Sequence, residues 1–475
     1  MRAPKRAAAL VGLAVVLLAG GLADRARRPG PGSDAAFSVA ARMPTAAPPG
    51  ALSATWYCPA NGAGAASPLN GTIIVANPTG LPVHGTLTVV PAGGGAGASA
   101  PVEVGPASVS SVVLAGLTTA TYAGVVVQLD GGQVVVEHKV AGPAGANLSP
   151  CASASSDRWY FADGSTARDA TLLLALFNPF PEDAIVDLSF VTDQGSAVPS
   201  DFQGVVVPGR GLVMIDVGEH VRRREWVATQ VSVRSGRLVA EEAQERTAPG
   251  RAGLSLTLGA PSAGGTWYFP DGLASATVAQ RLSVFNPTNR EARVEVAVSL
   301  DKGSAEPFEL TVPANDRAAL QLDRETRIPK NAAFSAIARS TNGVPVVVQR
   351  VVEIGAGPHA GRADSTGARR AVRRWALAAG AATPAIDEWI VLQNVSTRPA
   401  IVSIVGLADG QEVKIEGLQG LRVPAGARRA YRLGDHVQRD PLPVVVRSST
   451  PVVVERALFN PTGAGVNETM GIPLD

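Results

Sequence analysis

One short aromatic motif recurs along the chain at nearly constant spacing. Trp56-Tyr57-Cys58-Pro59 reappears as Trp159-Tyr160-Phe161-Ala162 and as Trp267-Tyr268-Phe269-Pro270, and a weaker copy begins at Trp375. The four tryptophans are separated by 103, 108 and 108 residues. A unit of this length is more than twice a propeller blade and can bury a core of its own. The repeat therefore predicts four tandem domains, joined like beads on a string.

Turn and strand-ending signals follow each tryptophan in a fixed order. Asp163-Gly164 and Asp271-Gly272 are typical of tight turns, which explains why an Asp recurs at this place. A strand-like run then ends at Asn-Pro, as in Asn286-Pro287, and a later one at Val-Pro, as in Val312-Pro313. Two Val-rich strands close each copy. Turn signals every 8–12 residues are typical of a β-sandwich, so we expect an all-β fold.

Composition agrees with this fold class and limits the partners. Hydrophobic residues make up 46% of the 475 residues and charged residues 17%, as in a globular protein. The 51 glycines and 36 prolines are spread along the chain, which favours short strands over long helices. A formal net charge of +2 gives no general attraction to nucleic acid.

The N-terminus carries a targeting signal. A basic start at residues 2–6 precedes an uncharged, mostly apolar run at 7–23, and arginines follow at 25–28. At about 1.5 Å per residue a helix over this run is marginal for spanning a bilayer. It therefore predicts either an uncleaved anchor helix or a signal peptide cleaved near Ala23. In both cases the rest of the chain lies outside the cell membrane.

These features divide the chain into six segments. Residues 1–23 are the signal or anchor, and 24–54 form a tether rich in Pro, Gly, Ala and Arg. Four β-sandwich repeats follow at residues 55–154, 155–262, 263–371 and 372–475. The fourth repeat diverges most, because its Trp is followed by Ala and its Asn394 by Val.

The order of these motifs resembles bacterial immunoglobulin-like surface domains. The Trp-Tyr-Phe-x-Asp-Gly start and the Val-Val-x-Glu-Arg end, as at Val453-Val454-Glu455-Arg456, are similar to an uncharacterised repeat family. That family occurs in envelope proteins of high-GC Gram-positive bacteria. The resemblance covers roughly residues 54–475. It implies tandem immunoglobulin-like β-sandwiches and an extracytoplasmic location, and it implies no activity or site residues.

Two cysteines are present, Cys58 beside the first Trp and Cys151 just beyond the last strand of the first repeat. In an exported chain this placement predicts a disulfide that ties the two ends of one domain together. Two unrelated free thiols are the alternative.

No residue pattern indicates an enzyme, a metal site or a cofactor. The five histidines lie in different local contexts, and none has a second His or Cys at metal-ligand spacing. Nucleophile-elbow and phosphate-loop motifs do not occur in the sequence. The acidic pair Glu241-Glu242 lies in a strand-like run and shows no catalytic pattern.

A few side chains are candidates for contacting a ligand or partner. Aromatic faces stack on sugars, yet a Trp fixed in every copy is more simply the large core residue of its sandwich. Trp226 and Trp389 lie outside that position and are better ligand candidates. The basic run Arg222, Arg223 and Arg224 could meet anionic lipid or wall polymer, or form a solvated loop.

Three hypotheses for function follow. The first is a non-catalytic envelope protein that acts as a structural spacer or an interaction scaffold. The second is a module that binds cell-wall or capsular glycan. The third is an accessory subunit of an envelope-assembly complex. The expected partners are the membrane, through the N-terminal segment, and cell-wall glycan or other envelope proteins.

Overall fold

The computed structural model describes residues 43–64, 67, 69–460 and 465–475, and this part of the chain is all-β. It contains short 3-10 turns (η1 Ser200–Phe202, η2 Val217–Glu219, η3 Leu322–Arg324 and η4 Leu433–Asp435) and no α-helix. Among these residues no helix is long and apolar enough to cross a membrane. The predicted anchor or signal at 1–23 and most of the predicted tether at 24–54 lie outside the described residues.

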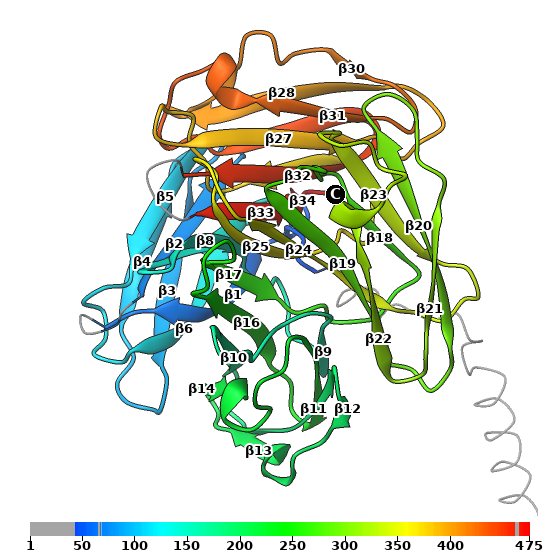
Figure 1. Cartoon of the computed structure of the whole chain (residues 1–475). Helices are drawn as coiled ribbons and strands as arrows, with labels where there is room; N and C mark the ends of the chain where they lie inside the picture. Colours follow the sequence, from blue (N-terminus) through cyan, green and yellow to red (C-terminus); the bar gives the residue numbers. More distant parts are fainter. Residues whose placement is uncertain (1–42, 65–66, 68, 461–464) are drawn as a thin grey trace, which may run out of the picture. The chain divides into compact units, whose positions relative to one another are not determined.

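The strands form four successive groups, which we call modules 1 to 4 (Figure 1). In module 1 the sheets are β1-β6-β3-β4 and β5-β2-β7-β8, all antiparallel. Their bounds are β1 Ser53–Gly62, β2 Asn70–Asn77, β3 Val83–Pro91, β4 Ser99–Val104, β5 Ser108–Val113, β6 Tyr122–Asp130, β7 Val135–Gly142 and β8 Gly145–Pro150.

Module 2 repeats this strand order, with sheets β12-β11-β15-β9, where β13 also pairs with β11, and β14-β10-β16-β17. Its strands are β9 Arg158–Phe161, β10 Ala170–Asn178, β11 Ala184–Thr192, β12 Gly195–Ala197, β13 Gln203–Val207, β14 Gly211–Asp216, β15 Val227–Ser235, β16 Val239–Arg246 and β17 Gly253–Leu258.

Module 3 does so again, with sheets β18-β23-β20-β21 and β22-β19-β24-β25. Its strands are β18 Thr266–Phe269, β19 Val278–Asn286, β20 Ala292–Leu300, β21 Phe308–Val312, β22 Asp316–Gln321, β23 Phe334–Ser340, β24 Val347–Ile354 and β25 Gly361–Thr366.

Module 4 differs because one long strand, β32, pairs with strands of both its layers. The element corresponds to two successive strands of the other modules that continue without a break. The strands are β26 Val372–Leu377, β27 Asp387–Gln393, β28 Ala400–Ala408, β29 Gln411–Lys414, β30 Leu421–Val423, β31 Arg428–Arg432, β32 Val444–Phe459, β33 Val466–Met470 and β34 Ile472–Pro473.

The repeated tryptophans lie in the cores, as expected. Trp56, Trp159, Trp267 and Trp375 are each at most 1% exposed. The indole N–H of Trp159 donates to the carbonyl of Leu238 at 3.0 Å, and Trp267 and Trp375 make the matching bond in their modules. In modules 2 to 4 the motif therefore fixes both packing and register, whereas the buried indole N–H of Trp56 has no hydrogen-bond partner among the described residues.

The Asn of each Asn-Pro signal holds two strand ends together. The amide of Asn286 donates to the carbonyls of Arg290, Val312 and Pro313, which joins the end of β19 to the end of β21. Asn394, followed by Val instead of Pro, makes the same three bonds in module 4. The amide is therefore the shared structural element, and these bonds form with or without a following proline.

Cys58 and Cys151 form the predicted disulfide. Their Cα atoms are 4.7 Å apart and the bond closes a span of 93 residues in module 1. Both cysteines are fully buried.

The expectation of beads on a string is wrong, because the described residues form one compact unit. The last edge strands of the modules, β8, β17, β25 and β33, contact one another in turn, and β33 returns to β8 (Figure 1). Each module therefore hides one sheet edge against its neighbours, which protects that edge from pairing with other chains.

Candidate functional site

Each module places a polar side chain at the same point of the strand that pairs with its last edge strand (β7, β16, β24 or β32), and we call this point the clamp position. The side chain is fully or almost fully buried, and its oxygen accepts the backbone N–H of the fourth residue after the Trp of the preceding module. The clamp residues and donors are Glu241 with Ala60 (3.1 Å), Gln349 with Asp163 (3.3 Å), Glu455 with Asp271 (2.9 Å) and Glu137 with Ala379 (2.7 Å). The last of these joins module 4 back to module 1.

The residue after the clamp position supplies a partner for a clamp carboxylate at three of the four interfaces, an arginine at two of them and a histidine at the third. His138 Nε2 lies 2.9 Å from Glu241 Oε1. Arg350 donates to both oxygens of Glu455, and Arg456 Nη1 lies 3.1 Å from Glu137 Oε2. All of these side chains are fully buried. Removing one member of such a pair strands the other charge in the interior.

The interface between modules 2 and 3 departs from this rule in a compensated way. At this interface the residue after the clamp position, which we call the partner position, is Glu242, and the clamp position holds the neutral Gln349. Burial raises the pKa of Glu242 well above its usual range, and the carboxylates of Asp364 and Asp163 raise it further. A neutral amide at the clamp avoids adding a further buried carboxylate to this group.

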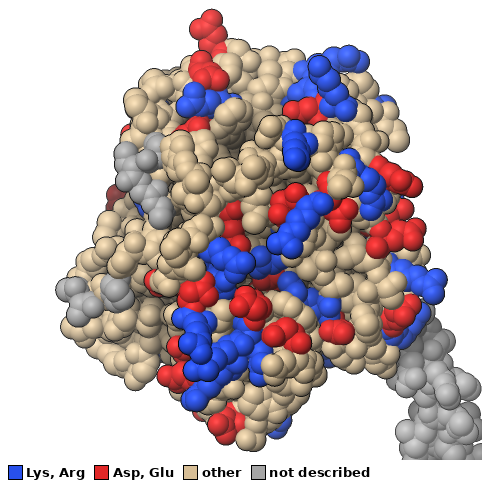
Figure 2. Space-filling model, in the orientation of Figure 1, with Lys and Arg blue, Asp and Glu red and all other residues tan. Residues whose placement is uncertain are grey.

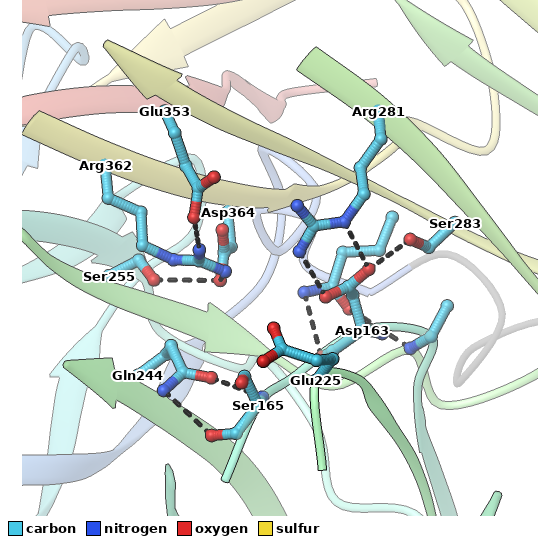
Figure 3. A network of polar contacts seen from close by, with 12 residues as sticks. Asp163, Ser165, Glu225, Gln244, Ser255, Arg281, Ser283, Glu353, Arg362 and Asp364 are labelled. Atoms are coloured by element: carbon cyan, nitrogen blue, oxygen red, sulfur yellow. Dashed lines mark hydrogen bonds and ion pairs between the residues drawn. The ribbon is translucent and has the colours of Figure 1, made fainter. Parts of the chain in front are cut away.

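A second set of contacts holds modules 2 and 3 together around Asp163 (Figure 3). Arg281 of β19 donates to both carboxylate oxygens of Asp163, at 2.9 and 2.7 Å. Arg317 of β22 and Ser283 also donate to it. Burial by itself would raise the pKa of Asp163, but the two guanidinium groups hold it well below its usual range. The sequence interpretation of this Asp as a turn former is therefore wrong, because its carboxylate belongs to an intermodule ion pair.

Close by, Figure 3 shows Arg362 facing Glu353 and Asp364 of the same module. Arg362 Nη2 lies 2.9 Å from Asp364 Oδ2, and Ser255 of module 2 donates to the same oxygen at 2.9 Å. On the face drawn in Figure 2, basic and acidic side chains are interspersed and form no single-sign field.

The interface between modules 3 and 4 repeats the Asp163 contacts with fewer partners. Asp271 accepts from Arg428 of β31, whose Nε also donates to the Pro270 carbonyl at 3.1 Å. Arg317 makes the same pair of contacts in module 3, to Asp163 and to the Ala162 carbonyl. This interface has no counterpart of Arg281, the second arginine that binds Asp163. In module 4 the position equivalent to Arg281 is occupied by Trp389, because each of these residues pairs with the residue two after the clamp position.

A third difference removes an aromatic side chain. Trp226 lies just before Val227, whose N–H donates to the carbonyl of Gly164, and Ala333 lies just before Phe334, whose N–H donates to Gly272. The two residues are therefore equivalent. Trp226 places its ring 4.5 Å from the guanidinium carbon of Arg317. Among the described residues no aromatic ring stacks in this way on Arg428.

These substitutions open a cavity of about 720 Å³ between modules 3 and 4. Its wall is mostly apolar and includes Ala333, Val391 and the half-buried Trp389. His359 and Phe459, which stack at 4.2 Å, also line it. The polar lining includes Asp271, Gln280, Asp301, Lys302, Arg428, Arg429 and Glu468. A few polar groups in an apolar cavity of this size are typical of a binding site.

The structure separates the site candidates named from the sequence. Trp389 lines the cavity, whereas Trp226 fills the equivalent space at the neighbouring interface. Arg222 and Arg223 are exposed and Arg224 is half-buried, in the loop before β15, and Arg222 Nε donates to the Glu219 carbonyl. Sequence reasoning missed Ala333. The signal for Ala333 was the loss of a Trp at a repeat position, which alignment of the second and third copies would have shown.

Comparison with protein families gives one match. Residues 136–386, more than half of the chain, match the model described as "Family of unknown function (DUF5719)". The chain belongs to this family. The matched stretch includes all of modules 2 and 3, and therefore the equivalence of Trp226 and Ala333 lies within the family's own span. No curated protein matches the sequence significantly.

Solved structures show only low similarity to the chain. A Thermotoga maritima protein (1070) is 22% identical with a TM-score of 0.21, and covers 22% of this chain and 94% of its own. The Anabaena sensory rhodopsin transducer is 25% identical with a TM-score of 0.17, over 19% of this chain and 83% of its own. A tetra-tandem repeat from a large adhesion protein is 13% identical with a TM-score of 0.11, over 84% and 94%. Scores this low assign neither fold nor function.

Proposed function

We propose that this member of the family is a non-catalytic scaffold of the cell envelope, made of four immunoglobulin-like β-sandwich modules. The observation that supports it most is the cycle of buried clamp contacts from each module to the next and from module 4 to module 1. Such a cycle resists the relative motion that modules on a flexible string would have. A body of this kind suits the presentation of surfaces at fixed positions better than the spanning of a distance.

The proposed location rests on two features. The N-terminal run at 7–23 has the composition of an export signal or anchor. The disulfide between Cys58 and Cys151 suits an oxidising compartment outside the cytoplasm. We therefore place the modules on the outer side of the membrane, in the envelope of a high-GC Gram-positive bacterium.

The scaffold proposal is tested by cross-linking in intact cells followed by purification of the chain from native membranes. We expect envelope proteins to be recovered with the wild-type chain, and fewer with Arg456→Met, which breaks the contact between modules 4 and 1. Arg422→Met, at an exposed position, is the matched control and should behave as wild type. Recovery of the chain from the cytoplasm, or without any partner, would overturn the proposal.

The compactness of the four modules can be tested separately, by measuring the radius of gyration. A compact body of about 430 residues has a radius of gyration of about 22 Å, and we expect this value from small-angle scattering of the purified modules. A radius well above it would return the protein to the spacer hypothesis.

A further inference from the structure

The cavity between modules 3 and 4 has a filled counterpart in the same molecule. At the interface between modules 2 and 3, the indole of Trp226 lies 4.5 Å from the guanidinium carbon of Arg317, while that arginine holds Asp163. At the interface between modules 3 and 4, Arg428 holds Asp271 in the same way, and the equivalent of Trp226 is Ala333. The chain thus shows which chemical group fits beside this arginine: a flat aromatic ring.

We propose that the cavity is a docking site for an aromatic side chain of a partner protein, with an indole taking the place that Trp226 occupies one interface away. The proposal supplies the scaffold described above with a partner of defined chemistry. The proposal depends on the scaffold function in one respect only, namely that the partner is an envelope protein.

The walls of the cavity suit such a group. Trp389 and the stacked pair of His359 and Phe459 provide aromatic surface, and aromatic pairs contribute about 0.5–1.5 kcal/mol beyond the area that they bury. Arg428 offers a cation to the face of an inserted ring. Trp389 and Val391 occupy the positions that Arg281 and Ser283 hold in module 3, so the cavity wall is more apolar than the filled interface between modules 2 and 3.

One polar group in the wall lacks a partner. Gln280 is 2% exposed and its Oε1 accepts the N–H of Leu273, but its Nε2 has no hydrogen-bond partner among the described residues. A buried amide donor without an acceptor costs free energy, and a carbonyl of an inserted segment would relieve that cost if the Gln280 side chain turned its amide toward the cavity. A polypeptide supplies such carbonyls beside its aromatic side chains.

The size and rim of the cavity favour a protein segment over an isolated ring. At about 720 Å³ the space exceeds one indole and leaves room for residues on both sides of an anchor. Asp301 and Lys302, both exposed, bring opposite charges to the lining. An aromatic anchor in a desolvated pocket with a polar rim is the usual arrangement of the residues that dominate protein interfaces.

The test uses the purified protein and N-acetyl-tryptophanamide as the probe, with binding measured by ligand-observed NMR and calorimetry. We expect weak binding at one site. Ala333→Trp, which restores the side chain of module 2, should weaken binding by about 10-fold or more and leave the melting temperature unchanged or raised. Thr397→Trp, at an exposed position of module 4, is the control and should bind as wild type.

The reciprocal variant makes the test symmetrical. Trp226→Ala empties the equivalent space at the interface between modules 2 and 3, so a second site for the probe should appear. If Ala333→Trp or Trp226→Ala fails to fold, Trp389→Ala should still reduce binding of the probe, because it removes part of the cavity wall.

Three results would overturn the proposal. These are no binding to the wild type, equal binding to Ala333→Trp, and saturable binding of methyl glycosides in place of the aromatic probe. The last would assign the cavity to a glycan. Because the probe needs no cellular partner, failure here is distinguishable from failure of the scaffold proposal in the membrane experiment.

Discussion

Arg456 of module 4 and Glu137 of module 1 form a fully buried ion pair, with Nη1 and Oε2 3.1 Å apart, although 319 residues separate them. The same arginine donates to the carbonyl of Ala379 at 2.7 Å, and the N–H of Ala379 donates to Glu137. The pair therefore closes the cycle of modules through a network of backbone and side-chain hydrogen bonds.

Breaking this pair should destabilise the whole unit. Arg456→Met leaves the carboxylate of Glu137 buried without its cation, and we expect a loss of about 3–5 kcal/mol in the free energy of unfolding. The double variant Arg456→Met with Glu137→Gln should recover part of the loss, since no buried charge then remains. Urea denaturation of both variants measures this, and equal losses in the two would contradict the role given to charge.

The exception at the interface between modules 2 and 3 gives a second prediction. Gln349→Glu would place a carboxylate next to the buried Glu242 with no cation at the partner position, and should destabilise the protein, more at pH 8 than at pH 5. Adding Glu242→Arg recreates the arrangement of Arg350 with Glu455 and should recover most of the stability. Thermal melts of the single and double variants at both pH values provide the comparison. A double variant no more stable than the single one would show that the repeat rule does not transfer.

Glu388 predicts a pH dependence. The pKa of Glu388 is raised to about 8, and burial is the largest cause. Glu137 also raises this pKa, whereas Arg456 and the N–H of Ala381 lower it. The folded state therefore holds a proton that the unfolded state loses near its ordinary pKa of about 4.3. The resulting stability is fully present below that pH and is lost as the pH rises through 8.

Glu388→Gln keeps the neutral form at every pH, so its stability relative to the wild type should increase between pH 5.5 and pH 8.5. Denaturation curves at several pH values measure the difference. Glu416→Gln, at an exposed position, is the control and should run parallel to the wild type. A constant gap between Glu388→Gln and the wild type would contradict the raised pKa.

The Asn-Pro signal should owe its effect to the Asn. Asn286→Ala leaves three carbonyl groups without their shared donor and should cost about 2–4 kcal/mol. Pro287→Ala should cost less than about 1 kcal/mol, because Asn394 keeps the same bonds before a valine. Chemical denaturation of the two variants decides, and a larger loss from the proline change would reverse the assignment.

The disulfide should stabilise module 1 without being reachable in the native state. Chain-entropy arguments for a closed span of 93 residues give about 4–5 kcal/mol, and measured values run lower. We expect Cys58→Ser with Cys151→Ser to lower the denaturation midpoint. Native protein treated with reductant and alkylator should gain label only at the rate of unfolding, because both cysteines are fully buried. Rapid labelling under native conditions would contradict that burial.

The sequence could predict the elements because their causes are local. A Trp followed by a turn, an Asn at a strand end and Val-rich alternation each report on a few neighbouring residues, and the repeat multiplies the signal fourfold. The two cysteines could be paired because a repeat has only one first and one last strand. The ligand candidate Trp389 was chosen because it lies outside the repeated Trp position, and the structure places it in the cavity wall.

The same sequence misled wherever a repeated residue works across modules. Asp163 and Asp271 looked like turn formers because an Asp before Gly has a sufficient local explanation. Their partners, Arg281, Arg317 and Arg428, lie more than 100 residues away, and no periodicity links an Asp of one copy to an Arg of the next. In the sequence, the clamp residues stand out only as polar residues at the end of an apolar strand, and nothing there predicts their contacts with the preceding module.

The all-β class, the core tryptophans and the disulfide were thus determined by the sequence itself, since burial and hydrogen bonding within one module dictate them. The compact cycle of modules, the ion pair that joins Glu137 to Arg456 and the cavity beside Ala333 were decided by tertiary structure. The physical reason is that each depends on a buried charge or a missing side chain at an interface. The free energy of such a group depends on what the neighbouring module places against it.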